Sequence, residues 1–143
     1  MIWFKTYTLE DLALLNKAQG LASLLNISLC ILGPDYLVAS MPVNSNLYQI
    51  HGILHGGATC VLVETVASVA AHLCLDTSVQ SAVGSVINVN HLRPVKGGML
   101  IATAKPVHVG RQKHVWDIMV VAQDSDKLIA KGELTCAIIA RDT

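Results

Sequence analysis

Charged side chains are scarce in this chain of 143 residues. They make up 14% of its residues, and hydrophobic residues make up 52%, whereas ordinary soluble domains are about 25% charged. A monomer of this size would expose much apolar surface, so we expect a homo-oligomer that buries part of that surface between subunits. The formal net charge is zero and no stretch is strongly basic, which makes nucleic acid and anionic membranes poor partners.

Cysteine pairs, a secretion signal and linkers are also missing. The four cysteines form no C-x-x-C pair, and the chain opens MIWFKTYTLEDL rather than with a basic and then apolar segment. These features predict a reduced, cytoplasmic protein. No repeat or low-complexity tract interrupts the chain, so we expect a single domain over 1–143. The apolar run over 53–75 is long enough for a membrane span, but Glu64 at its centre, His72 and two glycines near its start argue against one.

Hydrophobic periodicity and turn residues predict an α+β fold. Thr8 is placed to cap an amphipathic helix, and Gly33-Pro34-Asp35 is typical of a hairpin turn. The last three apolar runs are joined by short turns and are expected to form an antiparallel meander, and one long helix is expected to pack on the sheet. Because that helix is apolar on nearly all sides, we expect the sheet to wrap around it and bury it. The expected elements are helices over 8–19 and 56–75, strands over 27–33, 36–43, 81–93, 99–109, 113–123 and 127–139, and a loop over 44–54.

The long helix carries one charged side chain, Glu64, in its middle. An ionised carboxylate is expensive to bury without a partner, and three interpretations remain open. Glu64 could face water on an otherwise buried helix, or it could form a structural ion pair with Arg93 or Arg111. It could also be a reactive carboxylate in a cleft, where burial tunes its pKa. Ser68 and His72 follow at intervals of four residues and extend a polar stripe along the same side.

The sequence His55-Gly56-Gly57 stands where this helix begins. The first N–H groups of a helix have no partner within it, and the helix dipole favours an anion there. The two glycines could admit a ligand to the backbone, or they could serve tight packing of the helix on the sheet. A free amide that stabilises an oxyanion and a carboxylate on the same helix fit acyl transfer. Glu64 lies about 12 Å along the helix from Gly56 at the standard rise, so cooperation at one carbonyl would need two subunits with antiparallel long helices.

Several stretches of the chain together resemble a known family. Gln49 precedes LHGGATCVLVETVASVAA, and NVNHLRPV and HVGRQKHVWDI follow it. The H-G-G-x6-E spacing followed by N-x-x-H-x-R-P is fairly specific, and the similarity extends over nearly the whole chain. On these residues the chain resembles the hotdog-fold acyl-CoA thioesterases, in particular their PaaI-like branch. The resemblance implies an antiparallel sheet wrapped around one long central helix, in subunits that pair through their sheets as a dimer of dimers.

The resemblance also implies a role for each residue of the site. Glu64 would be the catalytic carboxylate, as nucleophile or general base, and the Gly56 N–H would polarise the thioester carbonyl with help from His55. Gln49 would position the reacting carbonyl or water, and Ser68 would hold water or substrate. Coenzyme A would be part of the acyl-CoA substrate, and no other cofactor is expected. The substrate-binding positions would be His91 near the acyl pocket and, toward the nucleotide of coenzyme A, Arg93, Gly110, Arg111 and Gln112.

The segment before the glycines departs from the pattern of that branch. It reads Ile50-His51-Gly52-Ile53-Leu54 in place of Pro-Phe-Gly-Leu-Leu. The change falls at the mouth of the pocket and leaves open whether the acyl group is aromatic or aliphatic.

Two other chemistries and one other class of function compete with this hypothesis. His51 and His55 are four residues apart but have no third ligand spaced with them, so no metal is expected. An apolar setting would raise the pKa of Cys60 and blunt its reactivity, which favours a structural thiol. The alternative function is a non-catalytic acyl-CoA-binding or regulatory hotdog protein, which would bind thioesters without turning them over.

Overall fold

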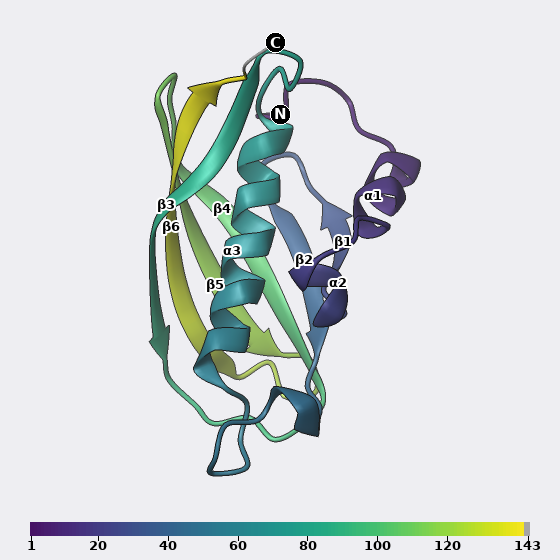
Figure 1. Cartoon of the computed structure of the whole chain (residues 1–143), viewed down its shortest axis with the longest axis vertical. Helices are drawn as coiled ribbons and strands as arrows, with labels where there is room; N and C mark the ends of the chain where they lie inside the picture. The colour runs from purple at the N-terminus through teal and green to yellow at the C-terminus, as the bar shows by residue number, and fades with distance from the viewer. Residues whose placement is uncertain (142–143) are drawn as a thin grey trace.

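The computed structural model describes residues 1–141, so the last two residues of the predicted 1–143 domain lie outside the described part. In the described residues, a six-stranded antiparallel sheet curves around the long helix α3 (Gly56–Leu73), as Figure 1 shows. The strand order is β1-β2-β4-β5-β6-β3. The strands are β1 (Ser28–Leu32), β2 (Leu37–Pro42), β3 (Gln80–His91), β4 (Met99–Val109), β5 (Lys113–Ala122) and β6 (Leu128–Ala140). The predicted α+β class is confirmed.

The N-terminal elements follow local signals in the sequence. Helix α1 (Leu9–Asn16) begins at Thr8, whose hydroxyl accepts from the Asp11 N–H while the Asp11 carboxylate accepts from the Thr8 N–H. This reciprocal capping box satisfies two amides that the helix leaves without partners. The Asn16 side chain then ties α1 to β1, because it donates to the Leu29 carbonyl at 3.0 Å and accepts from the Leu29 N–H at 2.7 Å. The short helices α2 (Leu21–Leu24) and η1 (Ser45–Leu47) were not predicted.

The expected meander of three strands is confirmed, and β3 lies outside it. Strands β4, β5 and β6 pair in sequence order, but β3 pairs with β6 and forms an edge of the sheet. The segment over 92–98 therefore crosses the end of the sheet instead of making a hairpin between β3 and β4. This places β3 beside α3, at a margin of the sheet that no other described strand covers.

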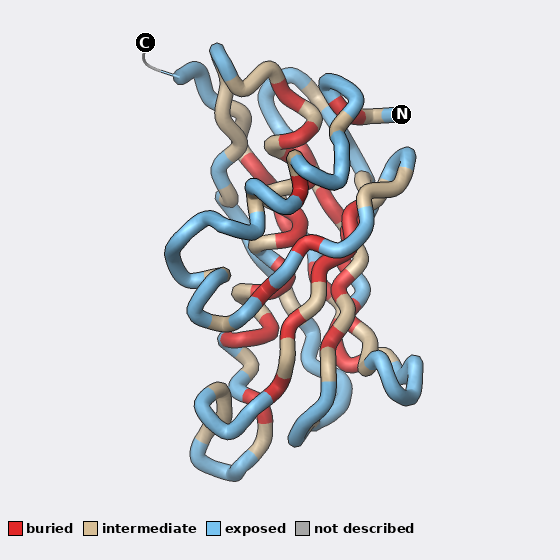
Figure 2. The backbone as a smooth tube through the Cα atoms, turned by 90° about the vertical axis from the view of Figure 1, so that its right-hand side faces the viewer, coloured by how far each residue is buried: buried red, intermediate tan, exposed pale blue. Residues whose placement is uncertain are grey.

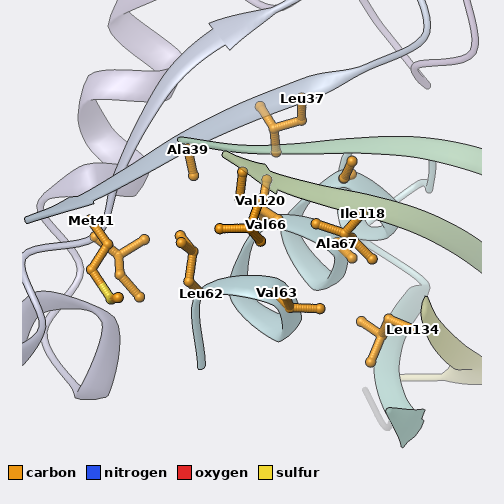
Figure 3. Packing of buried hydrophobic residues seen from close by; sticks show 14 of the residues in the cluster. Leu37, Ala39, Met41, Leu62, Val63, Val66, Ala67, Ile118, Val120 and Leu134 are labelled. Atoms are coloured by element: carbon orange, nitrogen blue, oxygen red, sulfur yellow. The ribbon is translucent and has the colours of Figure 1, made fainter. Parts of the chain in front are cut away.

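The core lies between α3 and the concave face of the sheet. Alternate residues of β5 point inward and are buried, including Trp116, Ile118 and Val120. They belong to one buried cluster with Leu62 and Val66 of α3, and Figure 3 shows Ile118 and Val120 facing this helix. Buried segments run through the centre of the molecule, and much of the chain around them is exposed (Figure 2).

One side of α3 differs from the prediction that the sheet buries this helix all round. Glu64 is exposed, while Ser68 and His72 are half-buried, because the sheet of the same chain does not cover this side. By length and hydropathy α3 could also span a membrane, but half of its residues are buried inside the fold, as in a core helix. The chain thus leaves one polar stripe of its central helix open.

Candidate active site

A cavity of about 360 Å³ opens at the N-terminus of α3. It collects four of the residues singled out from the sequence, namely Gln49, Gly56, His91 and Arg93. These residues come from three parts of the chain: the loop before α3, the first turn of α3 and the end of β3 with the segment that follows it. Thr59 also lines the cavity and is 2% exposed. Thr59 was not predicted from the sequence, although a hydroxyl one turn after the first glycine was a usable signal.

The local structure at the start of α3 leaves one amide free. The His55 imidazole caps the helix, because its Nδ1 accepts from the Gly57 N–H at 2.8 Å. The Ala58 N–H donates to the His55 carbonyl at 3.0 Å. In residues 1–141 no hydrogen bond uses the Gly56 N–H. His55 is thus the cap that leaves the Gly56 amide available at the positive end of the helix dipole.

His91 lies directly against Gly56. A Cβ added to Gly56 would stand 3.0 Å from the His91 Nε2 atom, closer than side chains normally pack. The glycine therefore lets the imidazole at the end of β3 approach the backbone of the first helical turn. Both groups border the same cavity, so a ligand there would meet an N–H donor and an imidazole together.

Gln49 is held by a tight turn before the helix. The Gly52 N–H donates to the Gln49 carbonyl at 3.0 Å, and the φ of +71° at Gly52 is one that glycine adopts without strain. The Gln49 side-chain oxygen accepts from the His51 N–H, which orients its amide group at the cavity. Ile50 and His51, the residues that depart from the family pattern, are exposed on the outside of this turn.

Glu64 lies on the open side of α3, away from this cavity. Arg93 is not its partner, because the Arg93 Nη1 donates to the Leu128 carbonyl at 2.6 Å. In the described residues no hydrogen bond or ion pair engages the Glu64 carboxylate. Its neighbour on the sheet is Gly84 of β3, where an added Cβ would stand 2.5 Å from Glu64 Oε1. Gly84 was missed in the sequence analysis, although a glycine inside a strand often marks a close approach.

The thiols around Glu64 are poor nucleophiles. Burial raises the pKa of Cys60, and the Glu64 carboxylate raises it further. Burial raises the pKa of Cys136 to about 11; a hydrogen bond from Ser68 opposes this shift and the charge of Glu64 adds to it. Both thiols are therefore protonated near neutral pH, as predicted for Cys60, and are poorly suited to nucleophilic attack. Ser68 lies one turn after Glu64 on α3, and its hydrogen bond with Cys136 places it against β6.

The turn over 110–112 lies at the other end of the sheet. On β6, Ala130 pairs with His91, whereas the Ile138 N–H donates to the Gln112 carbonyl. Ile138 is eight residues beyond Ala130, or about 26 Å along the strand. One chain therefore does not bring Gly110, Arg111 and Gln112 to the cavity that contains His91.

Metal ligation has little basis in the described part of the chain. No group of three His, Cys, Asp or Glu side chains in residues 1–141 is placed to hold a metal ion. That the protein uses no cofactor, with coenzyme A as part of its substrate, stays a prediction.

Fold and site together define the class of the protein. A curved antiparallel sheet wraps one long helix whose glycine-rich start opens on a cavity, and this is the architecture of the hotdog-fold thioesterases. The sequence matches the thioesterase superfamily over residues 51–129, more than half of the chain, and the chain belongs to that family. The prediction from the sequence is confirmed at this level.

Named relatives cover nearly the whole chain. The 1,4-dihydroxy-2-naphthoyl-CoA hydrolase of Escherichia coli is 38% identical over 139 residues, which are 97% of this chain and 100% of that protein. The proofreading thioesterase EntH of Cronobacter turicensis is also 38% identical, over 97% of this chain and 99% of its own length. A crystal structure of a glutamine-to-alanine mutant of thioesterase PA1618 from Pseudomonas aeruginosa superposes with a TM-score of 0.92 at 39% identity, covering 99% of this chain and 100% of that one. The chain is accordingly a thioester hydrolase.

Proposed function

We propose that the chain is a cytoplasmic acyl-CoA thioesterase that hydrolyses an aryl- or acyl-CoA, or the corresponding acyl-carrier-protein thioester, to a free acid and a thiol. The observation that carries the proposal is the pairing of two groups on one helix. Within residues 1–141 the Gly56 N–H, which borders a cavity, has no hydrogen-bond partner, and Glu64 stands unpaired on the open side of the same helix.

The reaction needs both groups. In our proposal the thioester oxygen accepts a hydrogen bond from the Gly56 N–H, which stabilises the negative charge as the carbonyl carbon becomes tetrahedral. As a general base, Glu64 would take a proton from water as the water adds, the C–S bond would break, and the thiolate would receive the proton. As a nucleophile, Glu64 would instead attack the carbonyl, expel the thiolate and form an anhydride that water then hydrolyses. Both routes require the carboxylate to be ionised before the reaction.

The separation of the two groups favours a site shared by two subunits. Gly56 and Glu64 are about 12 Å apart along the axis, too far for one carbonyl to contact both. Two antiparallel copies of α3 would place Glu64 of one subunit opposite Gly56 of the other. Strand β3 supports this arrangement, because its outer edge has no strand partner in the described residues and it exposes Val83, Val86 and Ile87. Such an edge is suited to pairing with a second copy, and we propose a dimer, assembled further into a dimer of dimers.

The remaining site residues would bind and orient the substrate. Gln49 and His91 border the same cavity as Gly56, where they can hold the thioester and its acyl group. Ser68 would hold water or substrate one turn after Glu64. His55 would act by capping α3 and so keeping the Gly56 amide free. In our proposal the nucleotide of coenzyme A binds between two subunits whose sheets run in opposite directions. One subunit contributes Arg93, and the other contributes Gly110, Arg111 and Gln112.

The experiment is a thiol-release assay on purified protein with benzoyl-, hydroxyphenylacetyl-, naphthoyl- and straight-chain acyl-CoAs. Turnover of at least one thioester is expected, and Glu64→Gln is expected to abolish it without changing the melting temperature. If Glu64→Gln lowered kcat less than about tenfold, or ~1.4 kcal/mol of barrier, Glu64 would not be the catalytic carboxylate. Binding of these thioesters without hydrolysis of any would favour the acyl-CoA-binding alternative.

A further inference from the structure

Gly84 of β3 lies directly beside the Glu64 carboxylate. A Cβ built on Gly84 would stand 2.5 Å from Glu64 Oε1, 3.5 Å from Glu64 Cδ and 3.6 Å from Leu134 Cδ1. Ordinary contacts begin at 3.4 Å, so only the oxygen is in serious conflict. The space that a side chain would fill at position 84 is thus occupied by the Glu64 carboxylate.

The backbone itself does not call for glycine at this position. The glycines with a positive φ in the described residues are Gly20, Gly52 and Gly98, so Gly84 has a conformation open to any residue. Glycine in a strand weakens it through the entropy of the unfolded chain and the lost packing. The close approach of Glu64 is the contact that accounts for the glycine.

The strand is also irregular at this point. Gly84 pairs with Cys136 and Val86 with Thr135, so Ser85 is an extra residue in β3, and its hydroxyl donates to the Thr135 carbonyl at 3.1 Å. A bulge of this kind locally changes the direction of a strand and is common beside active sites. Here it follows directly after the residue that faces Glu64.

We propose that Gly84 is a positioning residue for Glu64: the missing side chain lets the carboxylate rest against β3, and this contact determines where Oε1 meets the thioester. The proposal rests on the proposed function, in which Glu64 attacks the thioester or activates water. A Cβ at position 84 would push Oε1 back by about 1 Å, the difference between 2.5 Å and the 3.4 Å of ordinary contact. A misplacement of about 1 Å can cost up to ~100-fold in rate.

The test is the variant Gly84→Ala in the thiol-release assay. Because Glu64 is exposed and its oxygen is the far end of a flexible side chain, we expect the carboxylate to yield and the fold to stay intact. The expected result is a fall in kcat of about 10- to 100-fold, with KM and the melting temperature nearly unchanged. A kcat within twofold of the wild type would overturn the proposal.

Gly132→Ala is the matched control. Gly132 lies on β6, the strand that pairs with β3, and a Cβ there would stand 2.7 Å from Val63 Cγ1, on the residue directly before Glu64. Val63 is fully buried, so this variant should lower the melting temperature and change kcat less than Gly84→Ala. If Gly84→Ala lost as much thermal stability as Gly132→Ala, Gly84 would be a packing residue and the proposal would be wrong.

A rescue experiment tests direct contact. Aspartate is one methylene shorter than glutamate, so Glu64→Asp should harm the wild type but harm Gly84→Ala much less, since it withdraws the carboxylate from the added methyl group. Additive losses in the double variant would contradict the contact. The variant Glu64→Gln distinguishes a failure of Glu64 as the catalytic carboxylate from a failure of Gly84 as its positioning residue. If it keeps activity, the catalytic role of Glu64 and the role of Gly84 both fail; if it is inactive while Gly84→Ala is normal, only the role of Gly84 fails; and if the wild type hydrolyses no thioester, the proposed function itself fails.

Discussion

The backbone amide of Gly56 can be removed with little other change, which makes it the most informative single perturbation of the site. Gly56 is the first residue of α3, where a helix tolerates proline because the N–H has no partner within the helix. The preceding residue, His55, has φ −65° and ψ 130°, an extended conformation that suits a residue before proline. Gly56→Pro should therefore fold with α3 in place and lack only this donor.

The expected cost follows from the role of the amide. Loss of one oxyanion donor typically lowers kcat by about 100- to 1000-fold, or ~2.7–4 kcal/mol of barrier. Proline also adds a Cβ, which would meet His91 Nε2 at 3.0 Å. Gly56→Ala adds the same Cβ and keeps the N–H, so it measures the steric effect of that atom and should require His91 to shift by only a few tenths of an ångström.

The assay compares kcat and KM of both variants on one hydrolysed thioester, with melting temperature and far-ultraviolet circular dichroism as checks on folding. We expect the loss in kcat to be at least about tenfold greater for Gly56→Pro than for Gly56→Ala. Equal losses in two well-folded variants would refute the reasoning, because the N–H would then contribute nothing beyond the shape of the glycine.

Two further predictions concern stability. Burial lowers the pKa of His114; a hydrogen bond to Gly110 opposes this shift, and the charge of His108 adds to it. As the pH falls, the unfolded chain therefore binds the proton before the folded chain does. The melting temperature should accordingly fall as the pH drops below about 6.5. His114→Phe should flatten this dependence, measured by thermal unfolding between about pH 5 and 7.5, and an unchanged slope would assign the effect elsewhere. Asn16→Ala should lower the free energy of unfolding by about 1–3 kcal/mol, because it leaves the Leu29 backbone without its two partners. Urea titration measures this loss, and kcat should stay within about twofold of the wild type. A loss below ~0.5 kcal/mol would show that water replaces these hydrogen bonds.

Much of the fold follows from local signals. Thr8 and Asp11 mark the start of α1, the turn at Gly33-Pro34-Asp35 joins β1 to β2, and the length of the apolar run identifies α3. The position of β3 does not follow, because pairing with β6 depends on a crossing segment and on contacts distant in sequence. Local alternation detects a strand but does not specify which neighbour it will pair with.

The site was predicted unevenly for a similar reason. Gly56 and Glu64 stood out because a helix start and a lone charge are visible in one segment. Their separation on α3 was predictable from the rise of a helix. The contacts of Gly56 with His91 and of Glu64 with Gly84 join residues from different elements, so they required the folded chain. The exposure of Glu64 was one of the interpretations left open by the sequence, because the apolar composition suggested burial all round and the polar stripe suggested an open side.

The central claim is that each active site combines Glu64 of one subunit with Gly56 of another. Two inactive variants, Glu64→Gln and Gly56→Pro, test it when they are mixed, partly unfolded to allow subunit exchange, and refolded together. In a mixed dimer one site would carry both changes and the other none. Random pairing of equal amounts makes about half of the dimers mixed, so the mixture should recover about one quarter of the wild-type activity. Mixing Glu64→Gln with the double variant Glu64→Gln/Gly56→Pro controls for the procedure and should stay inactive. If the mixture of single variants stayed as inactive as this control although mixed dimers had formed, the two groups would not be shared between subunits.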